Sequence, residues 1–241
     1  YVMVVYDLRN PAGHGAVPDT NWAPPARHHP DWTLAKLGEV FGIALDDAPM
    51  PNIYLTSARV YNQSALGTGK VFKADGATGA VSTFAVLPNQ GEGLGNIAYD
   101  RAHQQFFVTD FYDGKIYRLN SSGTILQAFS PSGAGAPVPV TQRVWGIGVF
   151  EDRVYYGTWG PPSRVFSIAL DANGALIGTG ALEVTLPPGK SGSTEPISDL
   201  AFSVDGHLLV AERGMFNGSQ PIPHQARILE FPSYATFAQS F

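Results

Sequence analysis

Short runs of apolar, β-branched and aromatic residues recur along the chain, and each run is bounded by Gly, Asp, Asn or Ser. In residues 93–129, four of these runs read GLGNIAYD, QQFFVTDF, GKIYRLN and GTILQAF. Short strands joined by tight turns favour an antiparallel sheet, and four of them have the size of one propeller blade. The other parts of the chain can be aligned on this one.

A repeat with a period of about 50 residues runs through the chain. Four segments begin an apolar strand with a small or polar residue: 41–46, 95–100, 145–150 and 198–203. Their aligned second positions are Gly42, Asn96, Gly146 and Asp199, which are 54, 50 and 53 residues apart. Such spacing is typical of β-propellers. Small residues two places later suit inner strands that crowd a central axis: Ala44, Ala98, Gly148 and Ala201.

The predicted fold is all-β, a β-propeller of four-stranded antiparallel blades at about 37–88, 93–131, 143–187 and 196–232. Residues 1–36 are expected to form an N-terminal strand and an ordered loop rich in Pro and His that joins the propeller. Residues 233–241 are expected to form a terminal strand of a partial blade. We therefore expect five or six blades in the natural ring, with the chain extending beyond Tyr1 and Phe241, or open edges that another copy meets.

Composition narrows the classes of function. The 241 residues have a formal net charge of −5, and the 15 Lys and Arg are scattered, so nucleic acid is not an expected partner. No apolar run approaches the roughly 20 residues of a membrane helix. The chain has no Cys, which excludes disulfides and thiolate metal sites without fixing the compartment. The usual nucleophile-elbow, phosphate-loop, HExxH and dinucleotide-binding motifs are also absent.

The strand pattern resembles known families. GLGNIAYD followed by FFVTDFYDGKIYRL, and ISDLAFSVDGHLLVAER, are similar to NHL-type and gluconolactonase-like β-propellers. A narrower resemblance, to uncharacterised propeller modules of secreted bacterial surface proteins, rests on NWAPP (21–25), LGEVFGIALDD (37–47), GLGNIAYD (93–100), VWGIGVF (144–150), LLVAERGM (208–215) and HQARILEF (224–231). The resemblance implies a secreted module with a ligand that it does not identify.

Gluconolactonase-like enzymes hold a divalent metal on the propeller axis through Glu, Asn and Asp from different blades. The resemblance therefore implies an axial site formed by Glu39, Asn96 and Asp199, with oxygen ligands that suit Ca²⁺ or Mg²⁺. Gly42 and Gly146 occupy the other two matching positions, so only two ligands are clear. The alternative is that Asn96 and Asp199 cap turns or bind water at the mouth of the channel.

A second candidate site lies where the second strands of the blades end. Asp110 and Glu212 are aligned there and would suit acid–base chemistry, although such acids more often bind backbone N–H groups or an Arg. Trp145, Trp159 and Tyr112 are expected near one face of the disc, where aromatic residues bind glycans or peptides. Packing between blades is the alternative for these rings.

These observations favour a secreted binding or structural module, extracellular or on the cell surface with the periplasm as an alternative. It would bind a glycan, a protein or another copy of itself, including through its terminal strands. The alternative is a metal-dependent lactonase-like hydrolase in which an axial ion polarises a carbonyl. No catalytic set is complete, so the sequence leans away from an enzyme.

Overall fold

The computed structural model describes residues 1–7, 26–59, 69–133, 135–189, 192, 194–216 and 220–232. Most of the described chain forms four antiparallel sheets. The predicted terminal strand at 233–241 lies outside the described residues.

The first three sheets each pair four consecutive strands in sequence order, and the fourth has three strands in the part of the chain that the structure describes. The first sheet contains β3 (Glu39–Leu45), β4 (Ile53–Ala58), β5 (Lys70–Ala74) and β6 (Val81–Val86). The second contains β7 (Leu94–Asp100), β8 (Gln105–Asp110), β9 (Ile116–Asn120) and β10 (Ile125–Phe129). The third contains β11 (Val144–Phe150), β12 (Arg153–Thr158), β13 (Arg164–Leu170) and β14 (Leu176–Thr185). The fourth contains β15 (Ile197–Phe202), β16 (Leu208–Glu212) and β19 (Arg227–Phe231).

The remaining elements are short. They are β1 (Val5–Tyr6), β2 (Ala26–Arg27), α1 (Leu34–Leu37), η1 (Val140–Gln142), β17 (Met215–Phe216), β18 (Gln220–Pro221) and η2 (Pro223–Gln225). Within the described parts of the chain, no helix has the length and apolar character needed to cross a bilayer.

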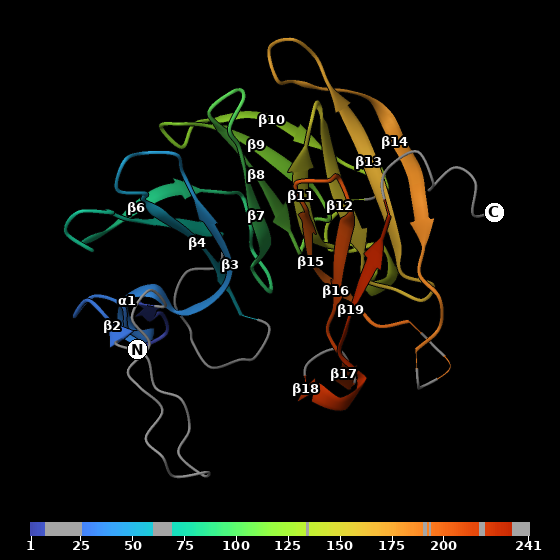
Figure 1. Ribbon diagram of the computed structural model, residues 1–241, viewed down its shortest axis with the longest axis horizontal. Helices are drawn as coiled ribbons and strands as arrows, with labels where there is room; N and C mark the ends of the chain where they lie inside the picture. The colour runs from blue at the N-terminus through green and yellow to red at the C-terminus, as the bar shows by residue number, and fades with distance from the viewer. Residues whose placement is uncertain are drawn as a thin grey trace.

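The four sheets are arranged around a common centre, with their first strands β3, β7, β11 and β15 innermost (Figure 1). Contacts join β3 to β7, β7 to β11, and β11 to β15, so each sheet packs on the next. This arrangement is a β-propeller, and the fold expected from the repeat is confirmed.

Apolar side chains fill the space between successive sheets. Tyr54 and Val71 of the first sheet pack on Phe106 of the second. Phe107 of the second sheet packs on Ile147 and Val154 of the third, and Tyr155 of the third packs on Leu208 of the fourth. Adjacent residues of β8 and of β12 serve opposite interfaces because neighbouring side chains on a strand point to opposite faces of the sheet.

The N-terminal segment covers the outer face of the first sheet. Met3, Trp32 and Leu37 pack there on Leu55 and Phe72. The indole N–H of Trp32 donates a hydrogen bond to the carbonyl oxygen of Gly79 at 2.8 Å, which fixes the segment to the β5–β6 hairpin.

The predicted N-terminal strand is mostly irregular. Within residues 1–7, Val5–Tyr6 alone forms a strand, β1, which pairs antiparallel with β2 of the same chain. Pairing within the chain counts against this strand as the one that would add to a neighbouring copy.

Candidate functional site

The structure brings the four aligned positions of the repeat together at the centre. A Cβ atom added to Gly42 would lie 2.8 Å from Cα of Asn96, and one added to Gly146 would lie 3.0 Å from the backbone nitrogen of Asp199. Asn96 Nδ2 lies 2.7 Å from Asp199 Oδ1, although these residues belong to the second and fourth sheets. A side chain at 42 would therefore force the central strands to shift, and one at 146 would fit only if its neighbours gave way by a few tenths of an ångström.

The central polar groups bind one another. Asn96 Nδ2 donates to Asp199 Oδ1 and, at 3.2 Å, to the carbonyl oxygen of Ser198. Asn96 Oδ1 accepts the N–H of Ile97 at 2.8 Å. Burial raises the pKa of the Asp199 carboxyl, and hydrogen bonds from the Leu200 N–H and the Asn96 amide oppose this shift.

This donor set does not fit the axial metal implied by the resemblance. Asn96 turns its amide nitrogen toward Asp199, so the pair offers an ion one carboxylate rather than two oxygen ligands. Glu39 is buried at the first position of β3, three residues before Gly42. Among the described residues, no group of three or more His, Cys, Asp or Glu side chains is placed to hold a metal ion.

An aromatic cluster lies where the central strands begin. Trp145 stacks on Trp159 with ring centroids 4.7 Å apart, and Phe111 meets both rings edge-on. Phe41 reaches Trp145 from the first sheet, with centroids 4.5 Å apart. Trp145 is 1% exposed and Trp159 is 6% exposed, so these rings contact other protein groups rather than presenting open faces. Both tryptophans are therefore packed inside the protein, as expected if these rings pack between blades rather than bind a ligand.

Two arginines lie over this cluster. The guanidinium of Arg143 lies 5.2 Å from the centroid of Phe111, and that of Arg213 lies 5.9 Å from the centroid of Trp145. Arg143 also forms an ion pair with Glu92. Cation–π contacts of this kind stabilise the packed rings.

Asp110 is fully buried at the end of β8. Its Oδ1 accepts hydrogen bonds from the Asn89 amide and from the backbone N–H groups of Tyr112 and Asp113, whereas no partner meets its Oδ2 in the described structure. Burial, with a further contribution from the Asp113 charge, raises the pKa of Asp110 to about 6. Tyr112 is half-buried, and its ring lies against Gly91.

Glu212 lies at the matching end of β16 in another sheet, with different partners. It accepts the N–H of Glu195 at 2.9 Å and forms an ion pair with Arg227. The other strand ends are similar, because Ser57 accepts the N–H of Lys70 and Thr158 accepts that of Arg164. The aligned polar positions therefore fix the loops and strands of their own sheets, and within the described structure no hydrogen bond or ion pair joins Asp110 to Glu212.

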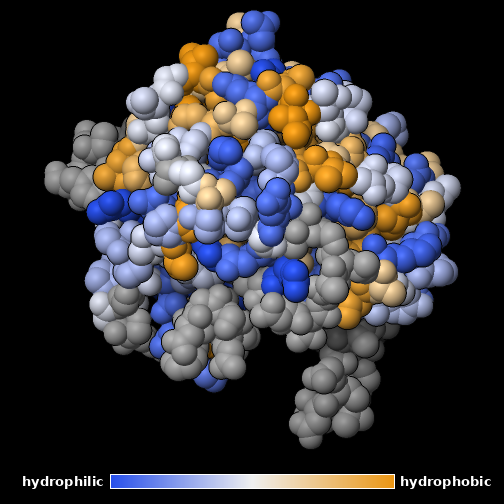
Figure 2. Space-filling view, turned by 180° about the vertical axis from the view of Figure 1, so that it is seen from behind, coloured by the Kyte–Doolittle hydropathy of each residue, from blue (hydrophilic) through white to orange (hydrophobic). Residues whose placement is uncertain are grey.

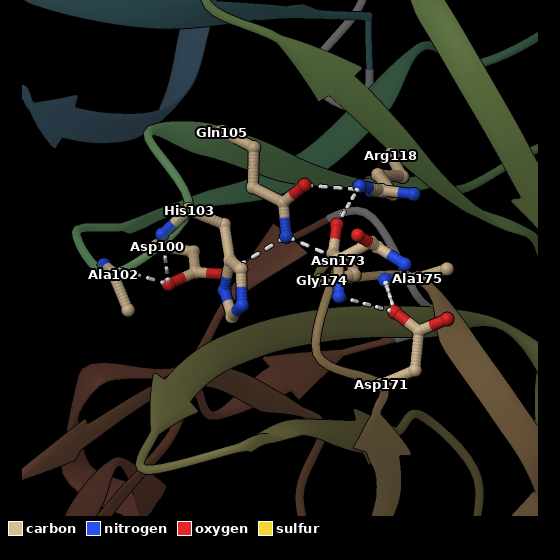
Figure 3. Close-up of polar contacts among 9 residues, drawn as sticks. All are labelled: Asp100, Ala102, His103, Gln105, Arg118, Asp171, Asn173, Gly174 and Ala175. Carbon is tan, nitrogen blue, oxygen red and sulfur yellow. Dashed lines mark hydrogen bonds and ion pairs between the residues drawn. The ribbon is translucent and has the colours of Figure 1, made fainter.

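A polar network at the other ends of the strands ties the second sheet to the third (Figure 3). Gln105 Nε2 donates to Asp100 at 2.8 Å and to the carbonyl oxygen of Gly174 at 2.9 Å. Gln105 Oε1 accepts Arg118 Nε at 2.6 Å, and His103 Nδ1 lies 2.7 Å from Asp100 Oδ2. This network was not predicted from the sequence, because its link to Asn173 and Gly174 forms only when the β13–β14 turn packs on the β7–β8 turn.

The fourth sheet exposes one of its faces, whereas the equivalent face of each of the other three sheets is buried. Pairing within the sheets places Ile228 opposite Ala211, just as Val71 is opposite Thr56, Ile116 opposite Thr109, and Val165 opposite Gly157. Val71, Ile116 and Val165 are all 0% exposed against the next sheet, whereas Ile228 is 75% exposed. Four residues make up this docking face: Ala201, Leu209, Ala211 and Ile228.

The view from behind shows a different kind of surface. There, hydrophobic residues form several separate groups among hydrophilic ones (Figure 2). Scattered exposed apolar residues are ordinary on a protein surface. The docking face is distinguished by its place in the repeat, because equivalent side chains are fully buried three times in the same chain.

No protein-family model matches the chain. No curated protein matches it either.

Solved propellers are similar in structure. A chain in a crystal structure of a nidogen/laminin complex aligns with a TM-score of 0.53 and 16% identity, over 83% of this chain and 67% of that one. Virginiamycin B lyase from Staphylococcus aureus aligns with a TM-score of 0.51 and 14% identity, over 88% of this chain and 60% of that one. A streptogramin B lyase gives the same TM-score and identity, and the alignment covers 59% of its chain. At such identities these likenesses support the β-propeller fold alone, and this chain spans about 60% of the length of the lyases.

Proposed function

We propose that this chain is a binding and structural module that associates with a second copy of itself through the docking face of the fourth sheet. The observation that carries the proposal is the contrast between Ile228, which is 75% exposed, and its three buried counterparts. Burying one such aliphatic side chain contributes about 1.5–3 kcal/mol, so the exposed face retains a driving force for association.

The repeat indicates what kind of partner fits. In the first three sheets, the face equivalent to the docking face packs against the next sheet along the chain. The residues of the next sheet that it contacts include Phe106, Ile147 and Leu208. The docking face therefore suits the apolar face of another antiparallel sheet, packed at about 10 Å. His207 Nδ1 lies 2.6 Å from Glu230 Oε1, and Glu230 pairs with Leu209 in the sheet, which gives the face a polar rim.

The N-terminal segment favours a second copy that binds face to face. Stacking copies head to tail would require the outer face of the first sheet, but Met3, Trp32 and Leu37 cover Leu55 and Phe72 there. Among the described residues, the uncovered sheet face that a second copy can offer is its own docking face. Two identical faces form a two-fold interface, which closes at a dimer.

Sedimentation equilibrium at micromolar concentration tests this proposal. We expect the wild-type chain to be a dimer and Ile228→Glu to be a monomer, because the variant places two carboxylates in the apolar contact. Val204→Glu is the matched control, because Val204 is fully exposed in the β15–β16 turn and does not belong to the docking face. A monomeric wild-type chain, or a dimer that Ile228→Glu leaves intact, would overturn the proposal.

Cross-linking gives a second readout. The chain has no native Cys, so Ile228→Cys introduces a single thiol. Where the two-fold axis passes beside position 228, this thiol lies next to its own copy, and mild oxidation should give a covalent dimer with Ile228→Cys but not with Val204→Cys. Equal yields from both variants would contradict the face-to-face arrangement.

The lactonase-like hydrolase is less well supported, because Asn96 and Asp199 bind each other. Calorimetric titration with Ca²⁺ and with Mg²⁺ tests it separately. Micromolar binding that Asp199→Asn abolishes would support the axial metal, whereas the arrangement of the Asn96 amide leads us to expect none.

The proposed location is extracellular or on the cell surface, and its support is the resemblance to modules of secreted bacterial proteins. Glycans and other proteins remain proposed partners alongside the second copy. Fractionation of the native host, followed by immunodetection of the protein, tests the location.

A further inference from the structure

A cavity of about 420 Å³ lies at the third sheet, beside the connector that leaves the second. The strands β11 to β14 contribute to its walls, and Pro131 and Ser132, which follow β10, close one side. Its volume lies within the roughly 300–1,000 Å³ of small-molecule sites. The cavity does not overlap the central residues or the docking face.

Tyr156 places an unpartnered hydroxyl in the wall of this cavity. The residue is 2% exposed, its ring stacks on Phe166 with centroids 5.6 Å apart, and its hydroxyl has no hydrogen bond to any described residue. A Cβ atom at Gly180 would lie 2.1 Å from this oxygen, so the absence of a side chain at position 180 makes room for it. Burial raises the pKa of Tyr156 to about 12, so the hydroxyl keeps its proton and can donate at neutral pH.

Arg164 supplies the charge. It is the one Asp, Glu, Lys or Arg side chain in the lining, it is exposed, and it has no ion-pair partner among the described residues. A guanidinium binds a carboxylate through two parallel hydrogen bonds. The cavity therefore favours a ligand that carries one negative charge.

The rest of the lining suits a sugar ring. Thr141, Gln142 and Thr179 are exposed at the cavity, and no hydrogen bond engages their side chains within the described structure. Phe166 and the adjacent prolines Pro161 and Pro162 supply apolar surface. A pyranose has apolar C–H faces and a rim of hydroxyls, and these need the same combination of flat apolar walls and short polar groups.

We propose that this cavity binds a sugar that carries a carboxylate, of the size of a hexuronate unit. The carboxylate binds Arg164, the ring lies against the apolar wall formed by Phe166, and the Tyr156 hydroxyl donates to a ring or hydroxyl oxygen. This site is independent of the proposed dimer, which uses a different sheet.

Titration followed by NMR chemical shifts tests the site with three probes: D-glucuronate, D-glucose and N-acetyl-aspartate amide. We expect glucuronate to bind roughly tenfold more tightly than glucose, because only glucuronate forms the charged pair. Arg164→Gln should weaken glucuronate binding by roughly tenfold and leave glucose unchanged. Tyr156→Phe should weaken both sugars by roughly threefold to tenfold, because it removes the donor and keeps the ring packing.

Arg101→Gln is the matched control, because Arg101 is an exposed arginine outside this cavity, with a long contact to Asp47. It should bind glucuronate as the wild-type chain does. Lack of glucuronate binding, or equal affinity in wild type and Arg164→Gln, would overturn the proposal. Tighter binding of N-acetyl-aspartate amide than of glucuronate would assign the site to acidic peptides and overturn it as well. Near-ultraviolet circular dichroism of each variant shows that its fold is retained.

Discussion

Replacing Gln105 with Ala should destabilise the protein more than any other single deletion of a hydrogen-bonding side chain between the second and third sheets. Gln105 is 2% exposed, and its amide joins three partners: Asp100 in its own sheet's turn, Arg118 in β9 and the Gly174 carbonyl in the third sheet. Figure 3 shows the amide between the two turns. No other described side chain in this network forms hydrogen bonds to all three groups.

The expected loss in the free energy of unfolding depends on whether the partner in each hydrogen bond is charged or neutral. Hydrogen bonds to charged partners contribute about 1.5–3 kcal/mol and a neutral one about 1 kcal/mol, and a partner that stays buried adds a desolvation cost. Asp100 keeps His103 and the Ala102 N–H as partners, and Arg118 keeps the Asn173 carbonyl, so these groups are not left unpaired. Because Arg118 is also partly exposed, we take the lower end of the range for the two charged bonds, which together with the neutral bond to Gly174 gives an expected loss of about 4 kcal/mol.

Urea unfolding followed by tryptophan fluorescence measures the change in the free energy of unfolding. Gln127→Ala is the matched comparison, because Gln127 also bridges the second and third sheets, through two neutral hydrogen bonds to the backbone of Leu176, each of 2.9 Å. It should cost about 1–2 kcal/mol. A loss below about 1 kcal/mol for Gln105→Ala, or one no larger than that for Gln127→Ala, would refute the assignment of stability to the charged partners.

Two further predictions concern the centre and the buried carboxyl. Gly42→Ala should destabilise the protein by about 2 kcal/mol or more, because the new methyl would lie 2.7 Å from Thr56 Oγ1 and 2.8 Å from Asn96 Cα; a change near zero in urea unfolding would show that the central strands can move apart. For Asp110, the pKa of about 6 in the folded protein lies above the unfolded value, so the native state holds more protons between these values and loses stability as pH rises from about 4 to about 6. The difference in unfolding free energy between wild type and Asp110→Asn should therefore change by about 3 kcal/mol across that range, and a pH-independent difference would contradict the raised pKa.

The sequence predicted the fold because propeller strands carry local signals. Each strand has its own apolar run and turn residues, and the aligned positions from Gly42 to Asp199 recur at a near-constant spacing. The same alignment correctly brought these positions together. Once the strands are aligned, their convergence requires no knowledge of side-chain geometry.

The chemistry of the site was harder to predict, because it depends on which way each side chain turns. Asn96 was a reasonable oxygen ligand by residue type, but its amide nitrogen faces Asp199. Phe41 was not identified as part of the aromatic cluster, although it occupies the same register position as Trp145, one residue before an aligned glycine. The cavity at Tyr156 depends on Gly180, a small residue in another strand, and no periodic signal marks that pairing.

The hydrogen bond between Asn96 and Asp199 has a consequence for how the molecule comes apart. In a row of units that touch only their nearest neighbours, the last unit can fray without disturbing the rest. Here a contact between residues 103 positions apart skips the third sheet and connects the second to the fourth. Detaching the final sheet must therefore also break a bond in the middle of the row, so amide protons of β15 should exchange with solvent nearly as slowly as those of β7.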